Sequence, residues 1–333
     1  MSKILFFGEP LIRITPFHND KLSNNMNSQI YYGGSEINIA KNMSGFNIDT
    51  AIFTALPNNP IGDSFLDFMR ESYIDTKHIQ RCGERIGIYF LINGCGIRNS
   101  EVYYDRKFTS INDIDLSLID MNQLFEGITH FHFSGITIAI SSKVREILLV
   151  LLKEAKKRNI TISLDLNLRT KMISIEDAKK YFSKFASYAD YCFGIDPLMI
   201  NDQDTTMFDR INATEQTIEK RMKDLCDTYH FKAIFHTLRY IDENEVNSYQ
   251  AYAYTTKLYH SIEIKTKILE RVGSGDAFVA GALYQIINNA STQNIIDFAV
   301  AAGSMKCTLS GDNMSQSEKA ISALLQNHIE ISR

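Results

Sequence analysis

The first hundred residues combine one short, wholly apolar run with several runs in which apolar and polar positions alternate. The run Ile4–Phe7 predicts a strand buried on both faces, because it has no polar position to turn toward water. Alternation with a period of two predicts strands that bury one face only. The alternating runs are Leu11–Thr15, Gln29–Tyr32, Ile86–Ile92 and Glu101–Tyr104, and the helices predicted between them are Ser35–Ser44 and Asp63–Ser72.

From about residue 128, apolar strands and amphipathic helices follow one another regularly. The predicted strands are His130–Ser134, Ile160–Leu164, Tyr188–Phe193 and Ala233–Thr237, and the predicted helices are Ser142–Arg158, Ile175–Ala186 and Thr214–Tyr229. Strands separated by helices pair in parallel through right-handed crossovers. The sequence therefore predicts an α/β fold with a three-layer, doubly wound, mainly parallel sheet.

The C-terminal part predicts two further strands and three helices. The strands are Tyr249–Tyr254 and Leu258–Ile264, and the helices are Gly275–Ile287, Gln293–Lys306 and Ser317–Gln326. Ser315 and Glu318 have the spacing of a capping box at the start of the last helix. No repeat or long linker interrupts the chain. We therefore predict one domain over residues 1–333, with a small β-sheet lid formed by segments of about 9–34 and 85–107.

Composition and charge narrow the classes of protein that this chain can represent. The 333 residues carry a formal net charge of −4, and only the short run Lys153–Arg158 concentrates basic side chains, so a nucleic-acid partner is not expected. No segment approaches the ~20 apolar residues that span a bilayer, and Ile4–Phe7 is too short for a signal peptide. The five cysteines are scattered and odd in number, which favours a reducing, cytoplasmic location.

The segment Gly273-Ser274-Gly275-Asp276 is the strongest candidate for chemistry. It follows a strand-like run and opens a helix, where glycines let backbone N–H groups turn toward an anion and the helix dipole adds positive potential. Asp276 would lie next to that anion, where a carboxylate accepts a proton from an attacking hydroxyl during phosphoryl transfer. A plain helix cap is the alternative, because Gly, Ser and Asp are also common at helix starts.

The wider pattern resembles the ribokinase-like (PfkB) carbohydrate kinase family, and within it the 2-keto-3-deoxygluconate kinases. The similarity spans nearly the whole chain in eight ordered blocks. Besides Gly273–Asp276, these blocks are Tyr31–Ala40, Gly87–Phe90, Tyr103–Arg106, His130–Ile136, Asp165–Arg169, Thr237–Arg239 and Gly311–Asn313. The resemblance implies a Rossmann-like body with a β lid that covers the sugar and often forms a dimer contact, which agrees with the predicted elements.

The resemblance also implies roles for individual residues. Asp276 would be the catalytic base, and the backbone amides of Gly273, Ser274 and Gly275 would bind the developing phosphoryl charge. The substrate-binding residues would be Gly33, Gly34, Asn38, Tyr89, Tyr104, Arg106, Arg169 and Asp312. The ATP-binding residues would be Asn167, Arg169, Thr237, Arg239, Gly273 and Gly275. Local alternatives are a tight turn at Gly33–Gly34, a surface ion pair for Arg106 and a simple turn at Asp312.

Two departures from the family pattern concern the metal and the phosphate loop. Relatives commonly have Asn, with Glu nearby, after the strand that corresponds to Tyr188–Phe193; here Ile195 takes the place of Asn, and Asp196 is the only acidic residue left. ATP and Mg2+ are the expected cofactors, with Asp196 as the sole candidate metal ligand or with Mg2+ held through phosphates and water. Ser274 replaces the usual Ala or Gly.

The leading hypothesis is an ATP-dependent kinase that phosphorylates 2-keto-3-deoxygluconate at its terminal hydroxyl. Two arginines, Arg106 and Arg169, suit an acidic sugar better than a neutral one. The alternatives are a fructokinase-like relative, or a non-catalytic sugar- or nucleotide-binding protein with an impaired metal site. A dinucleotide-dependent oxidoreductase is disfavoured because no G-x-G-x-x-G follows the first strand. Exposed strand edges of the lid favour a homo-oligomer.

Overall fold

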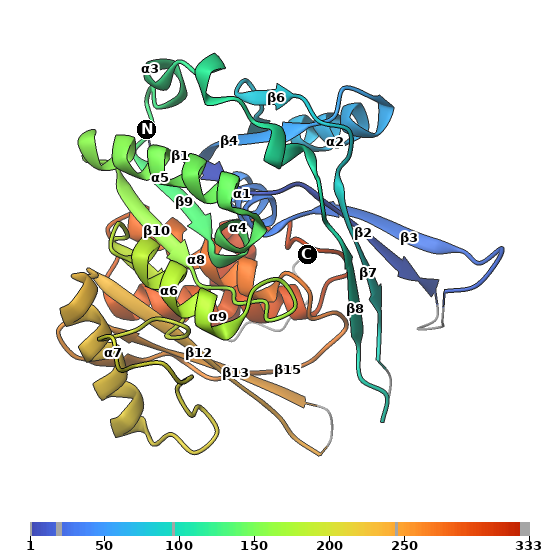
Figure 1. Cartoon of the computed structure of the whole chain (residues 1–333). Coiled ribbons are helices and arrows are strands. Elements are labelled where there is room, and N and C mark those ends of the chain that lie inside the picture. Colours follow the sequence, from blue (N-terminus) through green and yellow to red (C-terminus); the bar gives the residue numbers. More distant parts are fainter. Residues whose placement is uncertain (1, 18–21, 95–96, 244–245, 327–333) are drawn as a thin grey trace.

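A mainly parallel sheet forms the middle layer of the protein. The computed structural model describes residues 2–17, 22–94, 97–243 and 246–326. The sheet has eleven strands in the order β14-β13-β12-β11-β10-β9-β1-β4-β5, with β15 paired to β13 and β6 paired to β4 (Figure 1). These strands are β1 Lys3–Phe7, β4 Asp49–Leu56, β5 Ile74–Asp75, β6 Ile79–Arg81, β9 His130–Ser134, β10 Thr161–Asp165, β11 Tyr191–Phe193, β12 Ala233–Ile241, β13 Val246–Tyr254, β14 Leu258–His260 and β15 Ile264–Lys267. From β12 to β4 all neighbours pair in parallel, whereas β13 pairs antiparallel with β12.

Helices cover both faces of this sheet, and each face has its own hydrophobic core. One core joins the sheet to α4 Gly135–Ile140, α5 Ser142–Lys157, α6 Ile175–Ala186 and α7 Glu215–Tyr229. The other joins it to α1 Ser35–Gly45, α2 Pro60–Glu71, α8 Ser274–Ile287, α9 Thr292–Cys307 and α10 Glu318–Leu325. A short helix, α3 Met121–Leu124, precedes β9. The predicted three-layer, doubly wound α/β architecture is therefore confirmed.

A separate four-stranded sheet, called the small sheet below, projects from one side of this body (Figure 1). Its strands are β2 Leu11–Pro16, β3 Ser28–Gly33, β7 Gly87–Ile92 and β8 Glu101–Asp105, in the order β3-β2-β7-β8. Arg13 is paired with Tyr89, and Tyr89 with Tyr104, so these three residues share one face. We call this the inner face, because Tyr89 and Tyr104 line a cavity against the main body.

The opposite, outer face of the small sheet carries an apolar row across all four strands. Ile30, Ile14, Phe90 and Tyr103 are successive cross-strand partners. Ile30 and Tyr103 are 63% and 54% exposed. The two faces therefore differ sharply in their surroundings, as the alternation of the sequence predicts.

Helix α8 holds the candidate phosphate loop on a rigid, buried support. Every residue of α8 from Ala277 to Leu283 is buried, because the helix packs against the central sheet, α1 and α9. Gly281 faces Ala299 and Ala302 of α9, and a Cβ atom at this glycine would stand 3.0 Å from the Ala302 side chain. Small residues thus let the two helices approach closely.

Some details of the predicted secondary structure are wrong or incomplete. Strand β4, Asp49–Leu56, was not predicted, although it pairs with β1 in the middle of the sheet. The predicted strand Leu258–Ile264 is interrupted, since β14 ends at His260 and β15 begins at Ile264. The capping box is also wrong: the cap of α10 is Ser317, whose hydroxyl accepts a hydrogen bond from the Ala320 N–H.

Within the described residues, no helix is both long and apolar enough to cross a bilayer.

Candidate active site

Two adjoining cavities open at the C-terminal ends of the parallel strands. The first, of about 690 Å³, lies between the inner face of the small sheet and the start of α8. The second, of about 780 Å³, lies beside the ends of β11 and β12. Seven residues line both cavities: Asp165, Asn167, Leu168, Arg169, Arg239, Arg271 and Gly275. The two spaces therefore meet at the edge of a doubly wound sheet where ligands usually bind.

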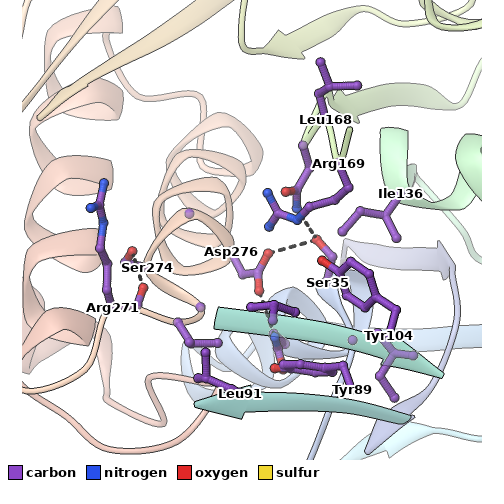
Figure 2. A pocket seen from close by; sticks show the side chains of 18 of the residues that line it. Ser35, Tyr89, Leu91, Tyr104, Ile136, Leu168, Arg169, Arg271, Ser274 and Asp276 are labelled. Atoms are coloured by element: carbon purple, nitrogen blue, oxygen red, sulfur yellow. Dashed lines mark hydrogen bonds between the residues drawn. The ribbon is translucent and has the colours of Figure 1, made fainter. Parts of the chain in front are cut away.

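Asp276 lies in the first turn of α8, and its carboxylate is held on both oxygens. The Ser35 hydroxyl donates to Oδ1 at 2.8 Å, and the Asn38 amide donates to Oδ2 at 2.8 Å. Both donors belong to α1, so contact between two helices fixes the carboxylate at the wall of the first cavity (Figure 2). This arrangement distinguishes the residue from a simple cap, because the N-cap of α8 is Gly273 and makes no side-chain cap bond.

Burial raises the pKa of Asp276 to about 6, while the Asn38 and Ser35 hydrogen bonds and the charge of Arg169 oppose that rise. A second carboxyl, Asp165 at the end of β10, has a pKa raised to about 7 by burial and by the nearby charge of Asp276. Two neighbouring carboxyl groups with raised pKa values at a cavity wall are typical of a site that handles protons.

The two glycines of the loop before Asp276 differ in what surrounds them. Gly273 has φ of 78°, and a Cβ atom there would lie 1.8 Å from the Asp312 carbonyl oxygen, so both conformation and space require glycine. A Cβ atom at Gly275 would meet nothing within 4 Å. The loop therefore presses against the 311–314 segment on one side and is open to the cavities on the other.

Ser274, between these glycines, connects the loop to an arginine. Its hydroxyl donates to the Arg271 carbonyl at 2.7 Å and accepts from Arg239 Nη2 at 2.9 Å. Arg239 also lies over the Tyr249 ring, 4.2 Å from its centroid. Thr237, two residues earlier on β12, lines the second cavity, as does Arg239. Ser274, where the sequence resemblance leads one to expect Ala or Gly, is thus a hydrogen-bonding centre.

The inner face of the small sheet contributes Tyr89, Tyr104 and Arg106 to the first cavity. Arg106 Nε and Nη2 donate to the Glu9 carboxylate at 2.9 and 2.5 Å, and Nη1 points at the Met172 sulfur at 3.0 Å. The Nε–Nη2 edge of the guanidinium is therefore already used by Glu9. Nη1 uses one of its two N–H groups on Met172, so its second N–H can face a ligand in the cavity.

Gly33 and Asp312 lie directly behind this wall. The Asp312 carboxylate accepts from the Tyr89 hydroxyl at 2.7 Å and pairs with Arg13 Nε at 2.9 Å. A Cβ atom at Gly33 would lie 2.8 Å from Asp312 Oδ2, so this glycine makes room for the carboxylate. Neither Gly33 nor Asp312 is among the residues that line the first or the second cavity.

Gly34 and Asn38 line the first cavity, and Gly34 is the N-cap of helix α1. Gly34 has φ of 120°, and a Cβ atom there would lie 2.3 Å from the Glu9 carbonyl oxygen. Gly34 therefore requires glycine both for its backbone conformation and for the space beside Glu9, and it forms part of the cavity wall.

The segment after β10 bridges the two cavities. Asn167 has a left-handed backbone with φ of 27°, its N–H donates to Asp165 Oδ1 at 3.2 Å, and its side chain donates to Ser35 Oγ at 3.1 Å. Figure 2 shows that the Arg169 side chain, from the same segment, lies near Asp276. A chain of hydrogen bonds thus runs from Asp165 through Asn167 and Ser35 to Asp276.

Asp196, the only candidate metal ligand, lines the second cavity but is bound by protein groups. Its carboxylate accepts from the Phe208 N–H at 3.2 Å and from Arg210 Nε at 3.3 Å. Ile195 is fully buried in the core. No group of three or more His, Cys, Asp or Glu side chains within the described residues is arranged to hold a metal ion. Asp165, which faces both cavities and forms no ion pair with a described cation, fits a metal held mainly by phosphates and water better than Asp196 does.

Three residues at the cavities, Ser35, Asp165 and Arg271, have no role that the sequence pattern alone predicts. Ser35 and Asp165 stand inside two of the quoted blocks, and Arg271 lies two residues before Gly273. A serine at a helix start and an acidic residue at a strand end are too common to single out without the neighbours that the fold supplies. In the folded protein, Ser35 lies against Asp276, and Arg271 borders both cavities.

Comparison with protein families gives one match over most of the chain. The model of the pfkB family carbohydrate kinase matches residues 1–223 and 248–319. These ranges include the small sheet, the loop before α8 and nearly all residues that line the two cavities.

Individual relatives agree with this match. A protein of Haloferax volcanii named 2-dehydro-3-deoxygalactonokinase is 24% identical over 315 residues, with 93% of this chain and 92% of that protein covered. A 2-dehydro-3-deoxygluconokinase of Thermoproteus tenax is 24% identical over 327 residues, with coverage of 94% and 90%. The crystal structure of a 2-dehydro-3-deoxygluconokinase from Thermotoga maritima superposes with a TM-score of 0.89 at 30% identity, with 98% of each chain covered.

Proposed function

Because this chain belongs to the pfkB family of carbohydrate kinases, we propose that it transfers the γ-phosphoryl group of ATP to the terminal hydroxyl of 2-keto-3-deoxygluconate or a closely related keto-deoxy sugar acid. The observation that carries this proposal is the Asp276 carboxylate, held by Ser35 and Asn38 next to the open amides of the α8 start. The names of the relatives from Haloferax volcanii, Thermoproteus tenax and Thermotoga maritima support the substrate class.

The reaction needs a base on one side of the phosphoryl group and positive charge around it. Asp276 accepts the proton of the substrate hydroxyl, whose oxygen then attacks the γ-phosphorus. The bond from phosphorus to the bridging oxygen breaks, and ADP leaves with the electron pair. The N–H groups at the start of α8 and the Arg239 guanidinium stabilise the charge that spreads over the phosphoryl oxygens.

The sugar acid binds in the first cavity and the nucleotide in the second. Tyr89 and Tyr104 supply hydroxyl groups and rings on the inner face of the small sheet, and Asn38 and Gly34 lie opposite. Arg169, which forms no ion pair with a described carboxylate, is the main partner for the substrate carboxylate, and Arg106 Nη1 adds a single donor. Thr237, Arg239 and Asn167 line the nucleotide side.

Sugar kinases of this family use ATP, generally with Mg2+. Mg2+ would be held by the nucleotide phosphates and water, with Asp165, which lines both cavities, as the candidate protein carboxylate, and it would neutralise phosphate charge. Asp276 deprotonates the substrate hydroxyl, and the loop amides and Arg239 position the phosphoryl group. The small sheet acts as the lid that excludes water from the first cavity.

We also propose that the outer apolar row of the small sheet joins two copies of the chain. Ile30 and Tyr103 expose more than half of their side-chain surface on a four-stranded sheet with free edges.

A coupled assay of ADP release tests the proposed reaction. The wild-type protein should release ADP with 2-keto-3-deoxygluconate, and the rate with fructose should be at least tenfold lower because a neutral sugar leaves Arg169 without its carboxylate partner. Turnover with fructose but with no sugar acid would move the protein to a fructokinase-like role. Binding of the sugar acid without ADP release above the level of Asp276→Asn would favour the non-catalytic alternative.

A further inference from the structure

Three arginine side chains lie where the two cavities meet. Arg169, Arg239 and Arg271 line both cavities. None of the three forms an ion pair with a carboxylate of the described residues, whereas the more deeply enclosed Arg13, Arg106 and Arg221 each do. Cations that face a cavity without a carboxylate partner are typical of an anion-binding site.

Two of these arginines are fixed against the same loop. Arg239 Nη2 donates to the Ser274 hydroxyl, and that hydroxyl donates to the Arg271 carbonyl oxygen. The guanidinium of Arg239 also packs over the Tyr249 ring. The Ser274 hydroxyl therefore ties the side chain of one arginine to the backbone of the other.

The two guanidinium groups also lie close enough to repel each other. Arg271 is exposed at the cavity, and its pKa is lowered by partial burial and by the nearby charge of Arg239. Keeping two like charges together without a carboxylate costs free energy that a bound polyanion would offset. Beside them the space over Gly275 is open.

The direction of Arg271 indicates which anion it meets. Figure 2 shows Arg271 on the far side of Ser274 from Asp276, Tyr89 and Tyr104. These three residues surround the place proposed for the sugar, so Arg271 extends toward the nucleotide side instead. The sugar carboxylate is therefore the less suitable partner, and the nucleotide phosphates are the more suitable one.

We propose that Arg239 and Arg271 form a two-arginine clamp on the β- and γ-phosphates of the nucleotide, with Arg271 as a phosphate-binding residue in addition to the loop amides and Asp276. This inference rests on the proposed function and deepens it. Because both side chains border both cavities, the clamp stays in contact with the phosphoryl group as it passes from nucleotide to sugar.

The affinities of ATP, ADP and AMP for Arg271→Gln, measured by calorimetry without a sugar, test the clamp. The Kd of ATP should rise about 10- to 100-fold and that of ADP less, while the Kd of AMP should change less than twofold, because charge-assisted hydrogen bonds to β- and γ-phosphates are lost. Arg271→Lys keeps the charge without the planar fork and should lie in between. Arg70→Gln, an exposed arginine of α2, is the matched control and should bind all three nucleotides normally.

Three outcomes would overturn the clamp. Equal weakening of AMP, ADP and ATP would mean that Arg271 only supports the fold of the cavity. Unchanged nucleotide affinity would mean that it binds no phosphate, and a rise in the KM of the sugar acid alone would assign it to the sugar carboxylate. These affinities are measured without an acceptor, so they test the clamp independently of the reaction. If the wild-type protein phosphorylates no sugar acid, that result contradicts the proposed function, and the calorimetry still tests the clamp.

Discussion

At the scale of single residues, the proposed chemistry depends on a carboxylate that the fold makes hard to ionise. Asp276 is buried, and its ordinary pKa near 3.8 is raised to about 6. A base with this pKa is ionised at neutral pH yet binds a proton more strongly than a surface carboxylate does. The same burial that suits catalysis therefore lowers stability, because the charged form is the one that burial disfavours.

Asp276→Asn should lose activity and gain stability at neutral or higher pH. We expect kcat to fall about 10²- to 10⁴-fold, the usual contribution of a general base. Asn38 Oδ1 has no hydrogen-bond partner. If the Asn38 amide group rotates by half a turn, this oxygen can accept a hydrogen bond from the amide introduced at position 276.

The stability gain has a definite pH dependence. The folded-state pKa of Asp276 is raised, so the wild-type protein is stabilised by this group below pH ~4 and loses that stability as pH rises through about 6. The free energy of unfolding of the variant should therefore exceed that of the wild type by up to about 3 kcal/mol at pH 8 and should equal it at pH 4. Urea unfolding at both pH values measures the difference, and an equal difference at both would contradict the origin assigned to it.

Ser35→Ala should move the pH dependence of the reaction. The Ser35 hydroxyl donates to Asp276 and favours its ionised form. Its loss should raise the midpoint of the kcat/KM profile by up to about one pH unit, since a hydrogen bond of about 1 kcal/mol corresponds to a little under one unit of pKa. Ser35→Thr keeps the hydroxyl and should restore the midpoint, whereas a lower kcat/KM with an unmoved midpoint in Ser35→Ala would assign the serine to packing only.

At the scale of elements, the loop before α8 is built by contacts with a distant segment. Gly273 touches the Asp312 backbone, and the same Asp312 side chain holds Tyr89 and Arg13 of the small sheet. The start of α8, the 311–314 segment and two strands of the small sheet are thus joined at one residue. A shift of any of these elements changes the shape of the cavity.

The two loop glycines should respond differently to alanine. Gly273→Ala places a Cβ atom against the Asp312 carbonyl in a left-handed conformation, and it should cost about 1–3 kcal/mol of unfolding free energy. Gly275→Ala should change stability by less than about 0.5 kcal/mol, because its Cβ atom meets no protein atom. Its methyl group enters the space proposed for the phosphoryl group, so kcat should fall at least tenfold. Thermal unfolding and the ADP-release assay together separate the two effects.

The order of strands and helices could be predicted for most of the chain, and the failures have local causes. Strand β4 reads Asp49-Thr50-Ala51-Ile52-Phe53-Thr54-Ala55-Leu56, which has neither clean alternation nor a continuous apolar run. It is a strand because β1 pairs along one edge and β5 and β6 along the other. Serines at 315 and 317 both have plausible cap spacing, and only the backbone decides, since Ser315 has φ of 50°.

The candidate site could be predicted where a short motif contains the chemistry, and not where distant residues create it. Asp276 and its glycines lie within four residues, whereas Asp312 and Arg13 are about 300 residues apart. Alternation in β2 predicts Arg13 on one face but gives no sign that the side chain is wholly buried. Its carboxylate partners, Asp312 and Glu270, belong to distant segments, so no local pattern marks the group.

At the scale of the whole molecule, the exposed row on the small sheet predicts a second copy. Ile30→Lys should convert a dimer into a monomer in sedimentation experiments, because a cation within an apolar contact is costly to bury. Ile211→Lys is the control, since Ile211 is 93% exposed and lies outside the small sheet. A monomeric wild-type protein, or a dimer that Ile30→Lys leaves intact, would contradict the proposed contact.

The Asp312 contact sets an order for assembly during protein synthesis. Arg13, Tyr89 and Gly273 all leave the ribosome before Asp312, which binds or touches each of them in the finished protein. Until then, burying the Arg13 guanidinium would leave it without one of its two carboxylate partners, which is unfavourable. We therefore expect the small sheet to dock last. Chains stalled before residue 312 should then be cut by protease within the small sheet. The nascent kinase should accordingly be unable to enclose ATP until its synthesis is nearly complete.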